Sequence, residues 1–149
     1  VLNPSVNAYR RLDPHFEAPN QIKASPIDRG SMVRIPIGNH RSARIEVRSI
    51  APDANPYLAV YTLFKTGLEG AVKSVAPDAI LPDNIYDAIA DFEASDYVKS
   101  LYGAEVASRY AGLKRASADR CPRLLGHRIK GAEIQFHHEV QNQYLWNNF

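Results

Sequence analysis

The sequence predicts an α+β fold in which antiparallel strands are followed by a helical C-terminal region. Two short runs of alternating polarity lie between Ser31 and Ser49, and such alternation is typical of strands with one apolar face. Beyond about residue 56, apolar residues recur instead at helical spacing. We expect residues 1–50 to form loops and strands and residues 51–149 to be mainly helical, all within one domain.

Composition excludes several classes of protein. Lys and Arg number 18 against 16 Asp and Glu, a net charge of only +2, which favours neither nucleic acid nor a membrane surface as partner. No apolar run approaches the roughly 20 residues of a membrane helix. The lone Cys121 excludes an internal disulfide and fits a reducing, cytoplasmic location. Because the chain starts at Val1 without Met, we expect it to be part of a longer protein.

The first 31 residues are predicted to be loop with short extended pieces. Their four prolines are too closely spaced for a long helix. Arg11 follows a second arginine, and Glu17 precedes Ala18-Pro19, where the backbone prefers extended geometry. Loops with such side chains often line sites. The alternative is that they are solvated surface charges.

The stretch from Ser31 to Ser49 is predicted to be an antiparallel hairpin. Apolar residues alternate in its first run and charged residues in its second: Val33, Ile35 and Ile37, then Arg44, Glu46 and Arg48. The turn Gly38–Arg41 can join the two runs. One sheet face would then hold the Glu46 carboxylate among guanidinium groups.

A helix is predicted to begin at Asn55-Pro56, because Asn caps free N–H groups and Pro fits the first helical position. Its apolar residues, from Tyr57 to Val75, occupy most of the circumference, so we expect a buried helix packed under the hairpin. A connector, Pro77 to Asp83, follows.

Three further helical segments are predicted. Ile85, Ile89 and Phe92 mark an amphipathic helix that ends near Ser95-Asp96. Val98 to Tyr102 lead to Gly103, after which Val106, Tyr110 and Leu113 mark a helix up to Arg115. The last segment starts near Ser117 and resumes with Ile134, Phe136, Val140, Tyr144 and Leu145.

Glu46 has three candidate roles: a structural ion pair, a metal ligand, or an orienting group for a substrate ammonium. On an isolated strand the structural ion pair is the commonest of these roles. A hard cation needs about six oxygen donors, so a metal site at Glu46 would require ligands from other residues.

Guanidinium groups are suited to bidentate capture of phosphate or carboxylate, and the chain offers a dense set: Arg11, Arg29, Arg34, Arg41, Arg44 and Arg48. Anion binding is therefore predicted. Nucleic-acid binding is a minor alternative, because aromatic interleaving, a helix-turn-helix and a zinc pattern are all missing from the sequence. No phosphate-binding P-loop motif is present.

Other reactive residues are interpreted as structural. His137 and His138 are adjacent, so on a helix they diverge by about 100° and do not form a zinc pair. Cys121 has no nearby base in sequence and is expected to be inert. Tyr86 is interpreted as an ordinary residue of a first helical turn.

Three motifs in order carry a resemblance: N-A-Y-R-R-L-D-P-H-F-E-A-P, D-R-G-S-M-V-R-I-P and R-I-E-V-R-S-I-A-P-D-A-N-P-Y-L. Together they resemble the C-terminal part of the catalytic domain of glutamine synthetases, over about Asn3 to Gly70. The resemblance implies that the strands belong to a larger sheet of that family. It also implies ATP-dependent ligation of glutamate and ammonia through γ-glutamyl phosphate, with Mg²⁺ or Mn²⁺, in a homo-oligomer with active sites between neighbouring subunits.

The resemblance also implies roles for single residues. Arg11 and Arg48 match substrate-binding arginines, and Glu17 matches the flap acid that helps to deprotonate ammonium. Glu46 matches a metal ligand. The nucleotide- and phosphate-binding set is Arg29, Arg34 and Arg41, of which Arg34 also contacts the transferred γ-phosphoryl group and Arg41 stands where the family commonly has lysine.

Some positions depart from the family pattern. Asp28-Arg29-Gly30 replaces the usual N-R-S, and Arg10-Arg11-Leu12 replaces K-R-L. Two alternatives therefore stay open: a γ-glutamyl-amine ligase that uses a larger amine, and a non-catalytic relative. The stretch from Cys121 to Gln135 is interpreted as an insertion. Since most of the family's metal ligands would lie upstream of Val1, we expect the chain alone to be inactive and to bind no nucleotide tightly.

Overall fold

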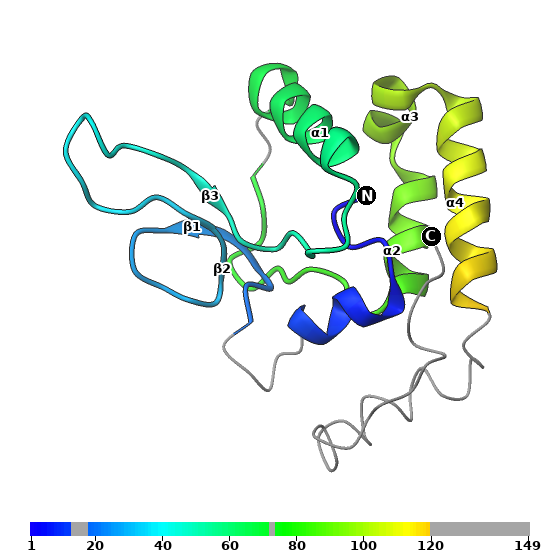
Figure 1. Ribbon diagram of the computed structural model, residues 1–149, viewed down its shortest axis with the longest axis horizontal. Helices are drawn as coiled ribbons and strands as arrows, with labels where there is room; N and C mark the ends of the chain where they lie inside the picture. The colour runs from blue at the N-terminus through cyan, green and yellow to red at the C-terminus, as the bar shows by residue number, and fades with distance from the viewer. Residues whose placement is uncertain (13–17, 72–73, 120–149) are drawn as a thin grey trace, which may run out of the picture.

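The computed structural model describes residues 1–12, 18–71 and 74–119, which form a small sheet and a group of helices. The elements in order are η1 (Val6–Leu12), β1 (Gln21–Ser25), β2 (Ser31–Arg34), β3 (Glu46–Val47), α1 (Pro56–Glu69), α2 (Ile85–Ala94), α3 (Asp96–Tyr102) and α4 (Ala104–Ala118). The sheet lies on one side, α2, α3 and α4 lie on the other, and α1 lies between them (Figure 1). This arrangement is consistent with the predicted α+β class.

The sheet is mixed rather than antiparallel, in the order β1-β2-β3. β2 and β3 pair antiparallel as predicted, with Arg34 opposite Glu46. β1 and β2 pair parallel, however, with Gln21 opposite Ser31, so the prediction of antiparallel strands throughout is wrong. The turn after β1 returns the chain to the start of that strand, where the N–H of Gln21 donates to the Gly30 carbonyl at 2.9 Å. Alternating polarity identifies a strand but carries no information on its direction.

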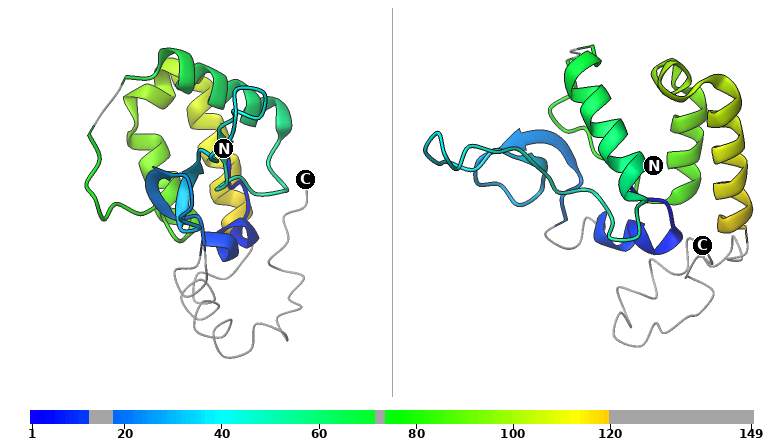
Figure 2. Two further views of the ribbon diagram at one scale, coloured as in Figure 1. Left: turned by 90° about the vertical axis from the view of Figure 1, so that its left-hand side faces the viewer. Right: turned by 45° about the horizontal axis from the view of Figure 1, so that its top comes forward.

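The connection between β2 and β3 is longer than the predicted four-residue turn at Gly38–Arg41. It spans residues 35–45 and extends away from the sheet (Figures 1 and 2). Pro36 lacks an N–H group and cannot donate to a sheet ladder, which accounts for the early end of β2. Within the loop, Asn39 Oδ1 accepts hydrogen bonds from the backbone N–H groups of Arg41 and Ser42 at 3.0 and 3.3 Å.

The main apolar core lies between α2 and α4. Ile85 and Ile89 of α2 contact Ala111 and Ala118 of α4, and all four are at most 5% exposed. The small alanines permit a close approach of the two helices. Ring contacts extend this core, with Phe92 lying 5.5 Å from Tyr110 and 6.3 Å from Tyr102 between ring centroids.

The predicted boundaries of these helices are largely confirmed. α2 begins after Asn84, whose side chain accepts the N–H of Asp87 at 2.9 Å, and Ser95 separates α2 from α3. Gly103 has a positive φ of 81° between α3 and α4, a conformation that glycine adopts without strain. The expected final helical segment beyond Ser117 lies largely outside the described residues, as do Cys121, His137 and His138.

The N-terminal segment contains a 3-10 helix where loop was expected. In η1 the N–H of Ala8 donates to Ser5 Oγ at 3.2 Å, and Leu12 is 2% exposed. Val6 and Tyr9 pack against the α2–α4 core. Tertiary contacts of this kind override the proline-based prediction.

The connector between α1 and α2 runs along the outer edge of β1. The backbone N–H of Ile22 donates to the carbonyl oxygen of Ala79 at 2.9 Å, and the N–H of Leu81 donates to the carbonyl oxygen of Asn20 at 2.7 Å. This pairing covers one edge of the sheet and ties it to the start of α2. Among the described residues, no helix is both long enough and apolar enough to cross a bilayer.

Helix α1 starts where the sequence predicts but is not buried. Asn55 Oδ1 accepts the N–H groups of Tyr57 and Leu58 at 3.0 and 3.2 Å. The helix ends at Glu69 rather than near Val75, and Ala59 is its one buried residue. The prediction of a buried helix under the hairpin is therefore wrong for this chain, since Tyr57 is 86% and Leu68 79% exposed.

The Asn55 cap gives a first test. Asn55→Ala removes the acceptor for two N–H groups and should lower the free energy of unfolding by about 1 kcal/mol, measured by urea denaturation. Asn55→Asp keeps an acceptor at the same position and should remain close to the wild type. Equal losses for the two variants would contradict the capping role.

Candidate functional site

The Glu46 carboxylate lies between two guanidinium groups on the β2–β3 pair. Arg34 of β2 stands directly opposite Glu46 of β3, and its Nε and Nη2 contact Oε2 at 2.7 and 2.6 Å. Arg44 Nε contacts the other oxygen, Oε1, at 2.8 Å. The predicted carboxylate among arginines is thus confirmed for Arg34 and Arg44. The ion pair, one of the three candidate roles of Glu46, is the arrangement present.

This cluster keeps Glu46 ionised in acid. The hydrogen bond from Arg34 has the largest effect on the Glu46 carboxyl; desolvation opposes it, and Arg44 adds to it, so that the pKa falls from 4.5 to about 2. Two positive charges face one negative charge, so the cluster carries a net positive charge. It can attract an anion while Glu46 holds both arginines in place.

Arg48 and Arg11 bind backbone carbonyls rather than Glu46. Arg48 Nη1 donates to the Arg29 carbonyl, which ties the end of β3 to the turn before β2. Arg11 Nη1 donates to the carbonyl oxygen of Ile50 at 3.0 Å, and Arg11 Nη2 donates to the carbonyl oxygen of Arg48 at 3.3 Å. These hydrogen bonds bring the predicted residues Arg11, Arg29 and Arg48 into one neighbourhood at the end of the sheet.

An acidic partner near this neighbourhood was missed by the sequence interpretation. Asp28 Oδ2 lies 2.6 Å from Lys23 Nζ, and its Oδ1 accepts the N–H of Gly30 at 2.8 Å. The Lys23 ammonium, with the Gly30 N–H group, lowers the pKa of Asp28. A Cβ atom at position 30 would lie 2.7 Å from Nε2 of the flexible Gln21 side chain.

Two predicted residues are not part of this neighbourhood as the structure describes it. Arg41 lies in the exposed loop between β2 and β3, and its backbone N–H caps the turn at Asn39. Glu17 lies outside the described residues, so its predicted role stays a prediction.

The described residues do not on their own fit a divalent metal. Both oxygens of Glu46 contact guanidinium nitrogens, and a hard cation requires about six oxygen donors. Within residues 1–12, 18–71 and 74–119, no group of three His, Cys, Asp or Glu side chains is arranged to hold a metal. Glu46 can supply at most one ligand.

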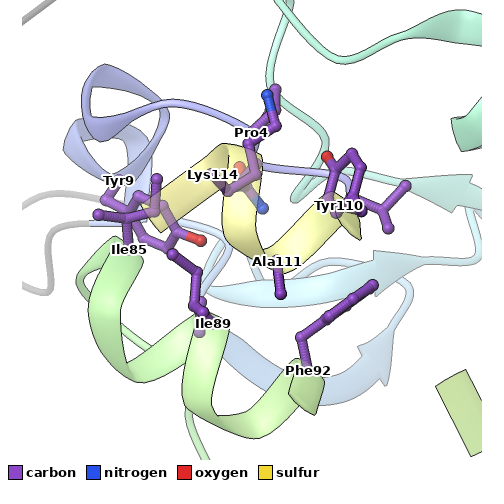
Figure 3. A pocket seen from close by; sticks show the side chains of 11 residues that line it. Pro4, Tyr9, Ile85, Ile89, Phe92, Tyr110, Ala111 and Lys114 are labelled. Carbon is purple, nitrogen blue, oxygen red and sulfur yellow. The ribbon is translucent and has the colours of Figure 1, made fainter. Parts of the chain in front are cut away.

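A small pocket lies elsewhere, between the N-terminal segment, α2 and α4. Its volume is about 40 Å³, and its lining includes Tyr9, Phe92, Tyr110 and Lys114 (Figure 3). Burial raises the pKa of Tyr9 and lowers that of Lys114. This space suits one or two water molecules rather than a nucleotide, and the described lining residues include none of the predicted site residues.

The Glu46 cluster gives a second test. Arg34 contacts Glu46 through two nitrogens and Arg44 through one, so Arg34→Gln should raise the Glu46 pKa more than Arg44→Gln. Carboxyl NMR titration measures both. Because the folded pKa of about 2 lies below the usual 4.5, the ion pair stabilises the fold above about pH 4.5 and loses this effect as the pH falls through about 2. The reverse order of the two variants would contradict the geometry.

Comparison with known proteins identifies the family. Residues 1–128 match the family described as the glutamine synthetase catalytic domain. The chain is 33% identical over 135 residues to a glutamine synthetase of Halobacterium salinarum, covering 77% of this chain and 30% of that protein.

Two other relatives with the same name give similar matches. The protein of Thermococcus kodakarensis is 42% identical over 87 residues, covering 58% of this chain and 20% of that protein. The protein of Methanosarcina mazei is 34% identical over 139 residues, a match that covers 80% of this chain and 31% of that protein. The chain thus spans between a fifth and a third of the length of these curated relatives. It belongs to the glutamine synthetase family and corresponds to the C-terminal part of that family's catalytic domain.

Proposed function

We propose that this chain is part of an ATP-dependent glutamate–ammonia ligase that acts through γ-glutamyl phosphate, and that it supplies the arginine-rich part of the active site. The Arg34–Glu46–Arg44 cluster carries the proposal. It holds two guanidinium groups in a fixed position with an excess of positive charge, on a chain of the glutamine synthetase family.

Arg34 is the proposed catalytic arginine. A transferred phosphoryl group spreads negative charge over its oxygens, and positioned cations stabilise that charge. Glu46 holds Nε and Nη2 of Arg34 from the neighbouring strand, while a guanidinium group has five N–H donors in all. The remaining donors can bind phosphate oxygens without loss of the ion pair. Arg29 and Arg41 are proposed to bind phosphates of the nucleotide.

Arg11 and Arg48 are proposed to bind the glutamate substrate. Their hydrogen bonds to backbone carbonyls fix both side chains at the end of the sheet, and guanidinium groups recognise carboxylates by paired hydrogen bonds. The Glu17 carboxylate is proposed to act as the base that accepts a proton from ammonium, so that free ammonia can attack the acyl carbon of γ-glutamyl phosphate and release phosphate.

Glu46 is proposed to contribute one ligand to Mg²⁺ or Mn²⁺ in the full-length protein. Its lowered pKa keeps it a carboxylate, the form that binds a hard cation. A complete site needs ligands from outside the described residues, because these hold no group of three His, Cys, Asp or Glu side chains that could bind a metal. For the same reason we propose that the chain alone does not catalyse. From its membership of the family we also propose that the full-length protein works as a homo-oligomer.

The test uses a chimera in which this chain replaces its matched region in the Methanosarcina mazei relative. The expected activity is phosphate release from ATP that requires both glutamate and ammonium. Arg34→Lys keeps a charge but loses the fork of donors, and should lower kcat by roughly 10²- to 10³-fold.

The matched control is Arg109→Lys on α4. Arg109 also pairs with a glutamate, Glu105, at 2.8 Å, but both side chains are 78% exposed, so its activity should stay within about twofold of the parent. Equal losses for Arg34→Lys and Arg109→Lys would contradict the role of Arg34. Phosphate release from ATP that requires a larger primary amine instead of ammonium would favour the γ-glutamyl-amine ligase. A folded chimera without activity would favour a non-catalytic relative.

A further inference from the structure

A very short connection joins the two parallel strands and carries one arginine of the site. Residues 26–30, here called the return segment, lead from the end of β1 back to the start of β2. Parallel strands are normally joined by a crossover of about a dozen residues or more. The return segment includes Arg29, whose carbonyl accepts a hydrogen bond from Arg48 Nη1. Its conformation therefore affects the placement of both arginines.

Asp28 makes most of the contacts that hold the return segment. Its backbone N–H donates to Ser25 Oγ at 3.0 Å, and its Oδ1 accepts the N–H of Gly30 at 2.8 Å. Its carbonyl accepts the N–H of Ser31 at 3.4 Å, and its Oδ2 lies 2.6 Å from Lys23 Nζ. Asp28 thus connects the segment to β1 on one side and to the start of β2 on the other.

The ion pair with Lys23 joins the return segment to the middle of β1. The register between β1 and β2 shifts between Gln21 and Ala24, and irregularities of this kind change the direction of a side chain. The side chains of Lys23 and Asp28 are 43% and 38% exposed, so the pair adds little to the overall stability. Its effect is local, because it restricts the orientation of the Asp28 carboxylate.

Aspartate at position 28 is one of the departures from the family's usual N-R-S. An asparagine could accept the N–H of Gly30 but could not form the ion pair with Lys23. The pKa of Asp28 is lowered first by the hydrogen bond from Lys23, then by that from Gly30, and also by the charge of Arg48. Without the carboxylate, Lys23 would add positive charge beside an arginine that has to be held in place.

We propose that Asp28 is a positioning residue, which fixes the return segment so that Arg29 and Arg48 lie in their binding positions. The inference rests on the proposed function, in which these two arginines bind the nucleotide and glutamate. Arg34 is held separately by Glu46. Asp28 should therefore affect the binding of the substrates and leave the transfer step unchanged.

The first experiment measures KM and kcat in the Methanosarcina mazei chimera. Asp28→Ala removes the acceptor for Gly30 and the partner of Lys23, and should raise KM for ATP and for glutamate by about three- to tenfold. The kcat value should stay within about twofold, in contrast to Arg34→Lys. Asp28→Glu keeps the charge but moves the carboxylate away from the backbone, and should raise both KM values as well. Unchanged KM values in Asp28→Glu would show that only the charge matters and would overturn the proposal.

The partner of Asp28 is tested by a double-mutant cycle. Asp28→Asn and Lys23→Gln each remove the ion pair, so each should raise both KM values, and the double variant should raise them no further than the larger single effect. Single effects that multiply in the double variant would contradict a role for the pair. The matched control is Asp96→Asn, which removes a pair with Lys99 at 3.3 Å on α3 and should keep both KM values within about twofold.

A second measurement uses the 149-residue chain itself and needs no activity. Nitrogen-15 relaxation reports the motion of the backbone amides of Arg29 and Gly30. Their order parameters should be near about 0.85 in the wild type and fall below about 0.6 in Asp28→Ala. The amides of α4 should not change, because Asp28 makes its contacts within the sheet region.

Two further results would overturn the proposal: unchanged order parameters at residues 29 and 30 in Asp28→Ala, and a lower kcat with unchanged KM values in the same variant. A folded chimera without activity would instead contradict the proposed function. In that case the relaxation measurement on the 149-residue chain still decides whether Asp28 fixes the return segment.

Discussion

The carboxylate of Glu46, held between Arg34 and Arg44, is the interaction on which the site depends. It joins β2 to β3 directly across the strand pair, and a slip of one residue would place the two side chains on opposite faces. The same contact keeps the glutamate ionised and both guanidinium groups fixed. The pair therefore sets the strand register, the local charge and the position of the proposed catalytic arginine.

The rest of the fold positions this cluster without enclosing it. Isoleucines, alanines and aromatic rings form the core between α2 and α4, and the connector after α1 joins that core to the edge of β1. In contrast, α1 and the loop after β2 expose large apolar residues. A well-packed helical unit beside a partly covered sheet is the physical form expected of a section of a larger catalytic domain.

The sequence predicts those features that depend on local chemistry. Asn55 and Pro56 identify the start of α1 because capping involves adjacent residues. The alternation around Glu46 predicts its arginine partners because strand periodicity fixes the faces. The three family motifs predict the family itself, which the match over residues 1–128 confirms.

Other features could not be predicted in this way. The parallel direction of β1 depends on a turn stabilised by backbone and Asp28 contacts. The exposure of α1 follows from where its neighbours lie, and apolar residues around its circumference gave no preference between its faces. The hydrogen bond from Arg48 goes to a backbone carbonyl, and backbone groups have no signature in sequence. The role of Glu17 remains a prediction.

We propose above all that Glu46 contributes one ligand to a divalent metal ion when the remainder of the catalytic domain is present. Electron paramagnetic resonance of Mn²⁺ tests it directly, with the chimera, its Glu46→Gln variant and the chain alone compared at equal concentration. We predict bound Mn²⁺ in the chimera, at least about tenfold weaker binding in Glu46→Gln, and the spectrum of free Mn²⁺ with the chain alone. Equal affinity of the chimera and its Glu46→Gln variant would contradict the claim.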